Sequence, residues 1–119
     1  MFQKQKYFRS KKHLKLVASL PCQVCGIENQ TQAAHSNWAK LGGKAKSLKA
    51  SDEYTAALCL KCHYEIDQGK DMSKEERQEM WEQAHVATVK KLYVQGLWPV
   101  DVPIPAFTIE PQLSSLQGH

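Results

Sequence analysis

Two pairs of cysteines with the same internal spacing constrain this chain more than any other feature. Cys22 and Cys25 form a C-x-x-C pair, and Cys59 and Cys62 repeat it after 33 intervening residues. Two such pairs supply the four thiolates of a tetrahedral zinc site, because each spacing places both sulfurs on one side of a turn. A four-thiolate shell leaves no open coordination position, so we expect this zinc to stabilise the fold.

The length and composition of the chain favour the same interpretation. A chain of 119 residues forms one small domain, which buries a limited core and gains from a metal site. The sequence contains no run of about 18 apolar residues, and its start lacks the uninterrupted apolar core of a secretory signal. We therefore expect a cytoplasmic protein without a membrane span, and in a reducing cytoplasm paired cysteines favour metal binding over disulfides.

Two other functions are compatible with the same cysteine motif. Cys59, Cys62 and His63 satisfy the C-x-x-C-H pattern of c-type haem attachment, which requires an exported protein and leaves Cys22 and Cys25 without a role. A thioredoxin-like redox pair requires a βαβ context, which neither pair has. Structural zinc is the favoured hypothesis, with haem attachment and redox chemistry as its alternatives.

The pattern of apolar and turn residues predicts an α+β fold. The expected elements are two short strands and three helices, over 31–37, 55–59, 10–20, 60–68 and 73–95. Ser73 and Glu76 form a capping box at the start of the last helix, and Gly96 ends it. A loop over 38–53 contains Gly42 and Gly43.

These elements indicate a single domain over residues 1–98 with a motif core at 22–68. The tail over 99–119 contains four prolines and few charges, so we expect it to be extended or disordered. His13 and His85 have no partner in the sequence pattern, and solvated or packing roles are expected for both.

The net charge of +4 conceals an asymmetric distribution. Residues 1–50 carry ten Lys or Arg and one acid, Glu28, whereas residues 51–119 carry six and eleven. A basic half is what a surface that binds a polyanion requires, although the same charges also suit a solvated face. The lysines that we expect to contact such a polyanion are Lys11, Lys12, Lys15, Lys44, Lys46 and Lys49.

His63 and Asp67 stand four residues apart on the predicted helix 60–68, so their side chains project from one face a turn apart. An imidazole and a carboxylate so placed provide half of a site for Mg²⁺ or Mn²⁺, although such a pair also occurs as an ordinary surface contact. Because His63 follows a zinc cysteine directly, the zinc site would fix where the helix starts and how the imidazole points.

The residues AAHSNW around His35, a Gly- and Lys-containing loop, and then ALCLKCHYEID resemble the HNH, or ββα-metal, nucleases over about residues 22 to 68. The chain is most similar to short phage and prophage members and to phage recombination nucleases, which carry a Lys-x-x-Asp element that would match Lys49 to Asp52. The resemblance implies a small ββα-metal core stabilised by the four-cysteine zinc site and flanked by N-terminal and C-terminal helices. It makes His35 the general base and makes His63 and Asp67 the ligands of a catalytic Mg²⁺ or Mn²⁺.

Two positions depart from the family pattern. The family usually has Asp or His directly before the base, where this chain has Ala34, and Asn nine residues before the helix histidine, where it has Tyr54. The residues that could support His35 in their place are Asn37, Asp52 and Tyr54.

The resemblance implies a metal-dependent endonuclease that hydrolyses phosphodiester bonds of DNA in phage or prophage DNA processing or recombination. In such a reaction a neutral His35 accepts a proton from water, and the cation stabilises the charge that grows on the phosphate. The alternative is a zinc-stabilised DNA-binding module that does not cut, because Ala34 and Tyr54 leave the family's catalytic set incomplete.

Overall fold

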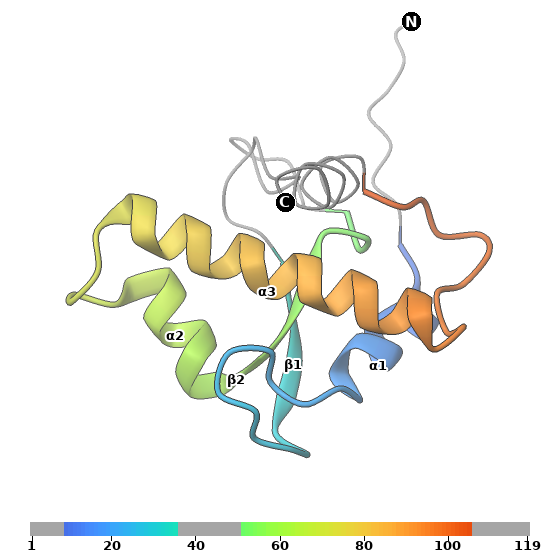
Figure 1. Ribbon diagram of the computed structural model, residues 1–119, viewed down its shortest axis with the longest axis horizontal. Coiled ribbons are helices and arrows are strands. Elements are labelled where there is room, and N and C mark those ends of the chain that lie inside the picture. The colour runs from blue at the N-terminus through green and yellow to red at the C-terminus, as the bar shows by residue number, and fades with distance from the viewer. Residues whose placement is uncertain (1–8, 36–50, 106–119) are drawn as a thin grey trace, which may run out of the picture.

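A two-stranded antiparallel hairpin with helices around it organises the chain (Figure 1). The computed structural model describes residues 9–35 and 51–105. The elements in chain order are α1 (Lys11–Ala18), β1 (Thr31–His35), β2 (Thr55–Cys59), α2 (Leu60–Gln68) and α3 (Lys74–Val94). The chain is therefore a small α+β protein, in which strand, strand and helix follow one another as the sequence predicts.

The ends of the helices follow from local chemistry. The Ser10 hydroxyl accepts a hydrogen bond from the backbone N–H of His13, so α1 begins at Lys11, and it ends at Ala18, two residues short of the predicted boundary. At α3, Ser73 and Glu76 form the reciprocal pair of hydrogen bonds of a capping box, as predicted. The first strand ends at His35, and the two further residues predicted for it lie outside the described ranges.

The register of the hairpin assigns the strand side chains to two faces. Ala34 pairs with Ala56, and His35 pairs with Thr55. Because alternate side chains of a strand point to opposite faces, Ala34 and His35 lie on different sides of the sheet. Ala34 is fully buried in a cluster with Leu58 of β2 and with Ile66 and Trp81 from α2 and α3.

The opposite face of the hairpin packs against α1. Ala57 of β2 is buried there with Val17 and Leu20, which come from α1 and the residues after it, and with Leu92 from the end of α3. The two-stranded sheet thus lies between two apolar clusters, and burial of both faces holds a sheet that is too small to be stable alone.

Polar side chains on the buried face of α3 attach this helix to the strands. The His85 Nδ1–H donates to the Thr55 carbonyl at 2.8 Å, and the Thr88 hydroxyl accepts from the Ala57 N–H at 2.9 Å. The Trp81 indole N–H donates to the Ala34 carbonyl at 3.1 Å, and its ring stacks on His85 with a centroid separation of 4.9 Å. Because each of these polar groups is buried and paired, they fix how α3 crosses the strands in Figure 1.

The first residues of the predicted tail pack on the core. Trp98 donates its indole N–H to the Val102 carbonyl at 2.9 Å, and Val102 itself is buried. The Trp98 ring lies edge-on to the buried ring of His13, with centroids 4.4 Å apart. Val102 and Pro105 are both buried, so the first part of the predicted tail packs on the domain, while the rest of the tail lies outside the described residues.

None of the helices in ranges 9–35 and 51–105 combines the length and apolar composition that a membrane crossing requires.

We expect His85 to make stability depend on pH. Burial lowers the pKa of His85 to about 4, and nearby His13 adds to this shift while the hydrogen bond to Thr55 opposes it. The pKa of a histidine in the unfolded chain is about 6.5, so on acidification the unfolded chain takes up this proton before the folded one. The stabilisation that neutral, buried His85 contributes is therefore complete above about pH 6.5 and is lost between about pH 6.5 and about pH 4. Between about pH 7 and 5 the wild type should lose about 2 kcal/mol more unfolding free energy than His85→Gln.

Urea denaturation of both proteins at each pH measures this difference. The glutamine variant keeps an amide donor for Thr55 but cannot titrate. Equal pH dependence in the two proteins would show that His85 does not carry the effect.

Candidate metal centre and active site

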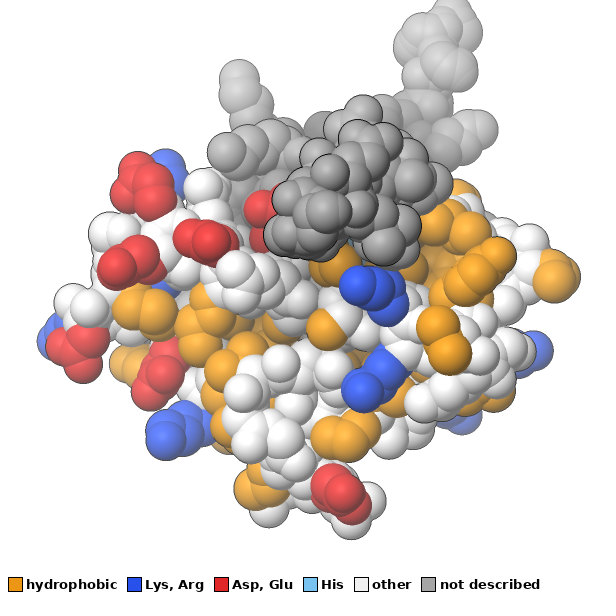
Figure 2. Space-filling model, in the orientation of Figure 1, with side chains coloured by type: hydrophobic (Ala, Val, Ile, Leu, Met, Phe, Trp, Pro, Cys, Tyr) orange, Lys and Arg blue, Asp and Glu red, His pale blue; other side chains and the backbone are white. Residues whose placement is uncertain are grey.

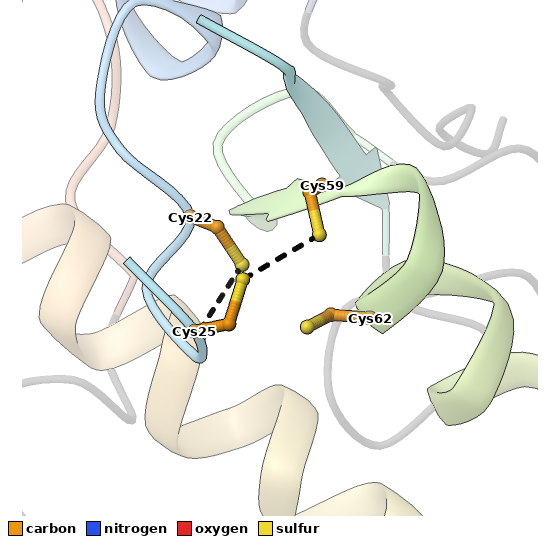
Figure 3. A group of neighbouring side chains, drawn as sticks. All are labelled: Cys22, Cys25, Cys59 and Cys62. Atoms are coloured by element: carbon orange, nitrogen blue, oxygen red, sulfur yellow. Dashed lines mark hydrogen bonds between the residues drawn. The ribbon is translucent and has the colours of Figure 1, made fainter. Parts of the chain in front are cut away.

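The four cysteines converge from two segments that lie far apart in the sequence. Cys22 and Cys25 lie in the turn before β1, Cys59 is the last residue of β2, and Cys62 is in the first turn of α2 (Figure 3). All four Sγ atoms lie within 4.8 Å of one another, and those of Cys25 and Cys59 are 3.7 Å apart. Sulfurs bound to one tetrahedral zinc at about 2.3 Å are separated by about 3.8 Å, so the cluster is compatible with structural zinc.

Backbone hydrogen bonds shape the first pair before any metal is considered. The N–H groups of Val24 and Cys25 point to the Cys22 sulfur at 3.4 and 3.5 Å, and the Gly26 N–H donates to the Cys22 carbonyl. Gly26 has a φ of +83°, which is costly for residues with a side chain. The turn thus presents both sulfurs on the side that faces Cys59.

The pKa shifts of the cysteines favour the binding of a cation by the cluster. Burial alone would raise the pKa of Cys22, but N–H groups of Cys25, Cys59 and Val24 outweigh it and lower that pKa to about 6. Burial and the neighbouring sulfurs raise the pKa of Cys62. One thiol ionises readily and the repulsion between sulfurs then opposes ionisation of another, so a divalent cation is what allows all four to become thiolates.

A second group of polar side chains lies along α2. The His63 Nε2 and Asp67 Oδ2 atoms are 3.2 Å apart, as expected for residues one turn apart on a helix. The other ring nitrogen, Nδ1, lies 3.1 Å from the Gln32 Oε1 atom on β1. Both side chains of the pair are between a quarter and a third exposed, so solvent and ligands reach them.

A third group surrounds Asp52, just before β2. The His35 Nε2 and the Arg9 guanidinium both lie 2.9 Å from Asp52 Oδ1, and the Ser10 backbone N–H donates to Oδ2 at 2.7 Å. Burial would raise the pKa of Asp52, but the hydrogen bonds from His35, Ser10 and Arg9 outweigh it and lower that pKa. Asp52 is therefore a buried carboxylate that holds the partly exposed imidazole of His35.

The two histidine–carboxylate pairs lie on different faces of the hairpin. Gln32, which contacts His63, and His35 are three positions apart on β1 and so point to opposite sides. His35 lies on the face of the hairpin that packs against α1, and His63 lies on the face that packs against α2. The structure brings together the residues within each pair, but it does not place the two pairs on one surface.

The two positions that differ from the HNH pattern, Ala34 and Tyr54, have structural roles. Ala34 is fully buried, and its carbonyl accepts from Trp81, so no metal ligand comes from this position. Tyr54 is half-buried with its ring 6.0 Å from that of His85, against α3. Of the three residues predicted to support His35, the structure shows contact for Asp52, and Asn37 lies outside the described residues.

Comparison with known proteins identifies one family. The family described as a protein of unknown function (DUF968) matches residues 2–95, which include all four cysteines and both histidine–carboxylate pairs. The chain belongs to this family. None of the curated proteins and none of the solved structures compared with the chain matches it significantly.

Charged side chains are distributed unevenly over this DUF968 protein. The exposed lysines of α1 are Lys11, Lys12 and Lys15, next to Arg9 and the His35 group. In the view of Figure 2, Asp and Glu side chains gather over α2 and the start of α3. The three remaining lysines of the prediction, Lys44, Lys46 and Lys49, lie outside the described residues.

Sequence reasoning does not identify Gln32, Arg9 or Ser10 as members of these groups. Gln32 and His63 are 31 residues apart, and Arg9 and Asp52 are 43 apart, so only the folded chain brings them together. Asp52 is predictable because it completes the Lys-x-x-Asp element.

We expect the purified DUF968 chain to contain one zinc ion bound by the four cysteines. Replacement of Cys59 by Ser should abolish tight zinc binding and unfold the domain, because structural zinc contributes on the order of 10 kcal/mol to folding of small domains. Elemental analysis and thermal melting measure both effects, with Ser19→Ala as an exposed control. A folded wild type without zinc, or a Cys59→Ser variant that melts like the wild type, would contradict this assignment.

Proposed function

We propose that this protein is a metal-dependent endonuclease that hydrolyses phosphodiester bonds of DNA, in phage or prophage DNA processing or recombination. The observation that carries the proposal is the hydrogen bond between His35 and buried Asp52. Two further features support it, the His63–Asp67 pair on α2 and the exposed lysines of α1. The four-cysteine cluster would hold the structural Zn²⁺ on which this arrangement depends.

His35 would act as the general base. Asp52 is an acceptor, so the Nε2 of a neutral imidazole donates to it and the Nδ1 atom carries the lone pair. Nδ1 accepts a proton from a water molecule as the water oxygen attacks phosphorus, and the bond from phosphorus to the 3′ oxygen breaks. Asp52 fixes the tautomer and the ring orientation and stabilises the imidazolium that forms.

His63 and Asp67 would hold the catalytic cation. Adjacent ligands of an octahedral ion with bonds of about 2.1 Å lie about 3.0 Å apart, so the 3.2 Å separation of Nε2 and Oδ2 suits Mg²⁺ or Mn²⁺. These ions commonly take one or two protein ligands and complete their shell with water, for which the partly exposed pair leaves room. When bound, the cation would stabilise the charge that grows on the phosphate and the leaving oxygen.

The proposal constrains how DNA lies on the protein. Because His35 and His63 belong to opposite faces of the hairpin, the scissile phosphate would have to lie beside β1, where side chains from both faces can contact it. The lysines of α1 share the His35 side and would bind neighbouring phosphates.

One observation favours the alternative, a zinc-stabilised DNA-binding module without catalysis. Ala34 occupies the position from which related nucleases take a further metal ligand, and Trp81 covers it. The metal shell would then rely on His63 and Asp67 alone. The alternative keeps the zinc and the DNA contacts and lacks only cleavage, so one assay separates the two.

We expect the wild-type protein to convert supercoiled plasmid to nicked and linear forms with Mg²⁺ or Mn²⁺ and not with EDTA. His35→Gln and Asp67→Asn should each reduce the rate at least about a hundredfold, because general base and metal contributions are of that order or larger. Zinc content and melting temperature should change little, since both side chains are partly exposed. Gel quantification of the plasmid forms gives the rates.

Asp71→Asn is the matched control, because Asp71 is an exposed acid in the loop after α2 and should be dispensable. A wild type that binds DNA and cuts no supercoiled, nicked or branched substrate would establish the binding-module alternative. Cleavage that survives both substitutions would mean that other residues perform the reaction.

We expect DNA affinity to depend on the lysines of α1. Replacement of Lys11, Lys12 and Lys15 by Gln should weaken binding to duplex DNA and reduce the slope of log affinity against log salt by up to about 0.9 for each phosphate that is no longer neutralised. Fluorescence anisotropy at salt concentrations between about 50 and 200 mM measures both quantities. The charge-matched control replaces Lys74, Lys90 and Lys91, which are exposed on α3. An equal slope change in the control would move the DNA-binding surface away from α1.

A further inference from the structure

Gln32 makes a contact that links the edge strand to the candidate metal pair. It is an exposed residue of β1, and its Oε1 atom lies 3.1 Å from the Nδ1 atom of His63 on α2. A side-chain amide oxygen is only an acceptor, so this contact favours a hydrogen on Nδ1. The Asp67 carboxylate, 3.2 Å from Nε2, is also an acceptor and competes by favouring a hydrogen on Nε2. The contact with Gln32 thus stabilises the Nδ1–H tautomer of a neutral His63 against this competition.

This tautomer determines what the other nitrogen can do. With the hydrogen on Nδ1, Nε2 has a lone pair that faces the Asp67 carboxylate oxygen at 3.2 Å. Two acceptors at that separation repel each other, and a cation between them removes the repulsion. In the opposite tautomer, Nε2–H would donate to Asp67, and Nε2 would have no lone pair to offer a metal.

We propose that Gln32 is a positioning residue that stabilises the Nδ1–H tautomer of His63, the tautomer in which Nε2 and Asp67 can hold a divalent cation together. The inference rests on the proposed function, in which His63 and Asp67 bind a metal ion. It adds a residue of β1, Gln32, that orients the ligand His63. It also explains why an exposed polar side chain of the edge strand points to α2. Partners of this kind commonly change metal affinity ten- to a hundredfold when they are removed.

Nuclear magnetic resonance of the full-length, zinc-loaded protein with ¹⁵N-labelled histidine tests the tautomer without any nuclease assay. At about pH 8, the ¹⁵N shifts of the two ring nitrogens of His63 measure what fraction of the rings carries the hydrogen on Nδ1, and this fraction should be substantial in the wild type. Gln32→Met has a similar length and no acceptor, and it should shift the population to hydrogen on Nε2. Gln32→Glu keeps an acceptor and should retain the wild-type tautomer. The His63→Gln variant lacks the ring signals of His63 and so identifies them in the wild-type spectrum.

Titration with Mn²⁺ gives the second readout. Gln32→Met should weaken binding about ten- to a hundredfold, while Gln32→Glu and the exposed control Gln68→Met should not weaken it. Hydrogen on Nε2 in the wild type overturns the inference even if no variant folds. Unchanged tautomer and Mn²⁺ affinity in a folded Gln32→Met protein also overturn it.

The two proposals fail in different ways. Mn²⁺ binding that depends on Gln32 in a protein that never cuts DNA would refute the nuclease and leave the role of Gln32 standing. If the wild type cuts DNA and Gln32→Met keeps the wild-type tautomer and metal affinity, the nuclease proposal stands and the role of Gln32 is refuted.

Discussion

The meeting of four sulfur atoms within 4.8 Å is the constraint on which the rest of the structure depends. It joins the turn before β1, the end of β2 and the first turn of α2. Three of the four cysteines are also buried in the apolar cluster that contains Leu58, Ile66 and Trp81, so the junction combines apolar packing with a site compatible with structural zinc. The two clusters on either side of the hairpin then complete a core that would be marginal alone.

The features that the sequence predicts are those encoded by neighbouring residues. The cysteine spacing, the capping box of Ser73 and Glu76, the two short strands and the i to i+4 relation of His63 and Asp67 are all local, and the structure has each of them. The sequence could not predict contacts between distant segments. Gln32 meets His63 only because the hairpin register and the four-cysteine cluster set α2 against β1. Trp98 holds the segment after α3 on α1 through its contact with His13, which no periodicity indicates.

The hairpin divides the candidate chemistry between its two faces. The α1 face joins a candidate proton acceptor to a basic surface through Asp52, and the α2 face joins a candidate metal pair to the cysteine cluster through the peptide between Cys62 and His63. Buried residues of α3 connect the faces, since His85 and Thr88 bind the backbone of β2 while Trp81 binds that of β1. Small changes in α3 would therefore alter the relative placement of both groups, although α3 supplies no reactive side chain itself.

One peptide bond separates a cluster cysteine, Cys62, from a candidate ligand of a second metal, His63. This adjacency would make the two proposed ions thermodynamically linked, because the conformation that binds one would also be the conformation that binds the other. Linkage is reciprocal, so an ion held by His63 and Asp67 would strengthen zinc binding by the same factor by which zinc strengthens the hold on that ion. In a cell where free zinc is scarce, the abundance of magnesium would then help to decide what fraction of this small domain stays folded.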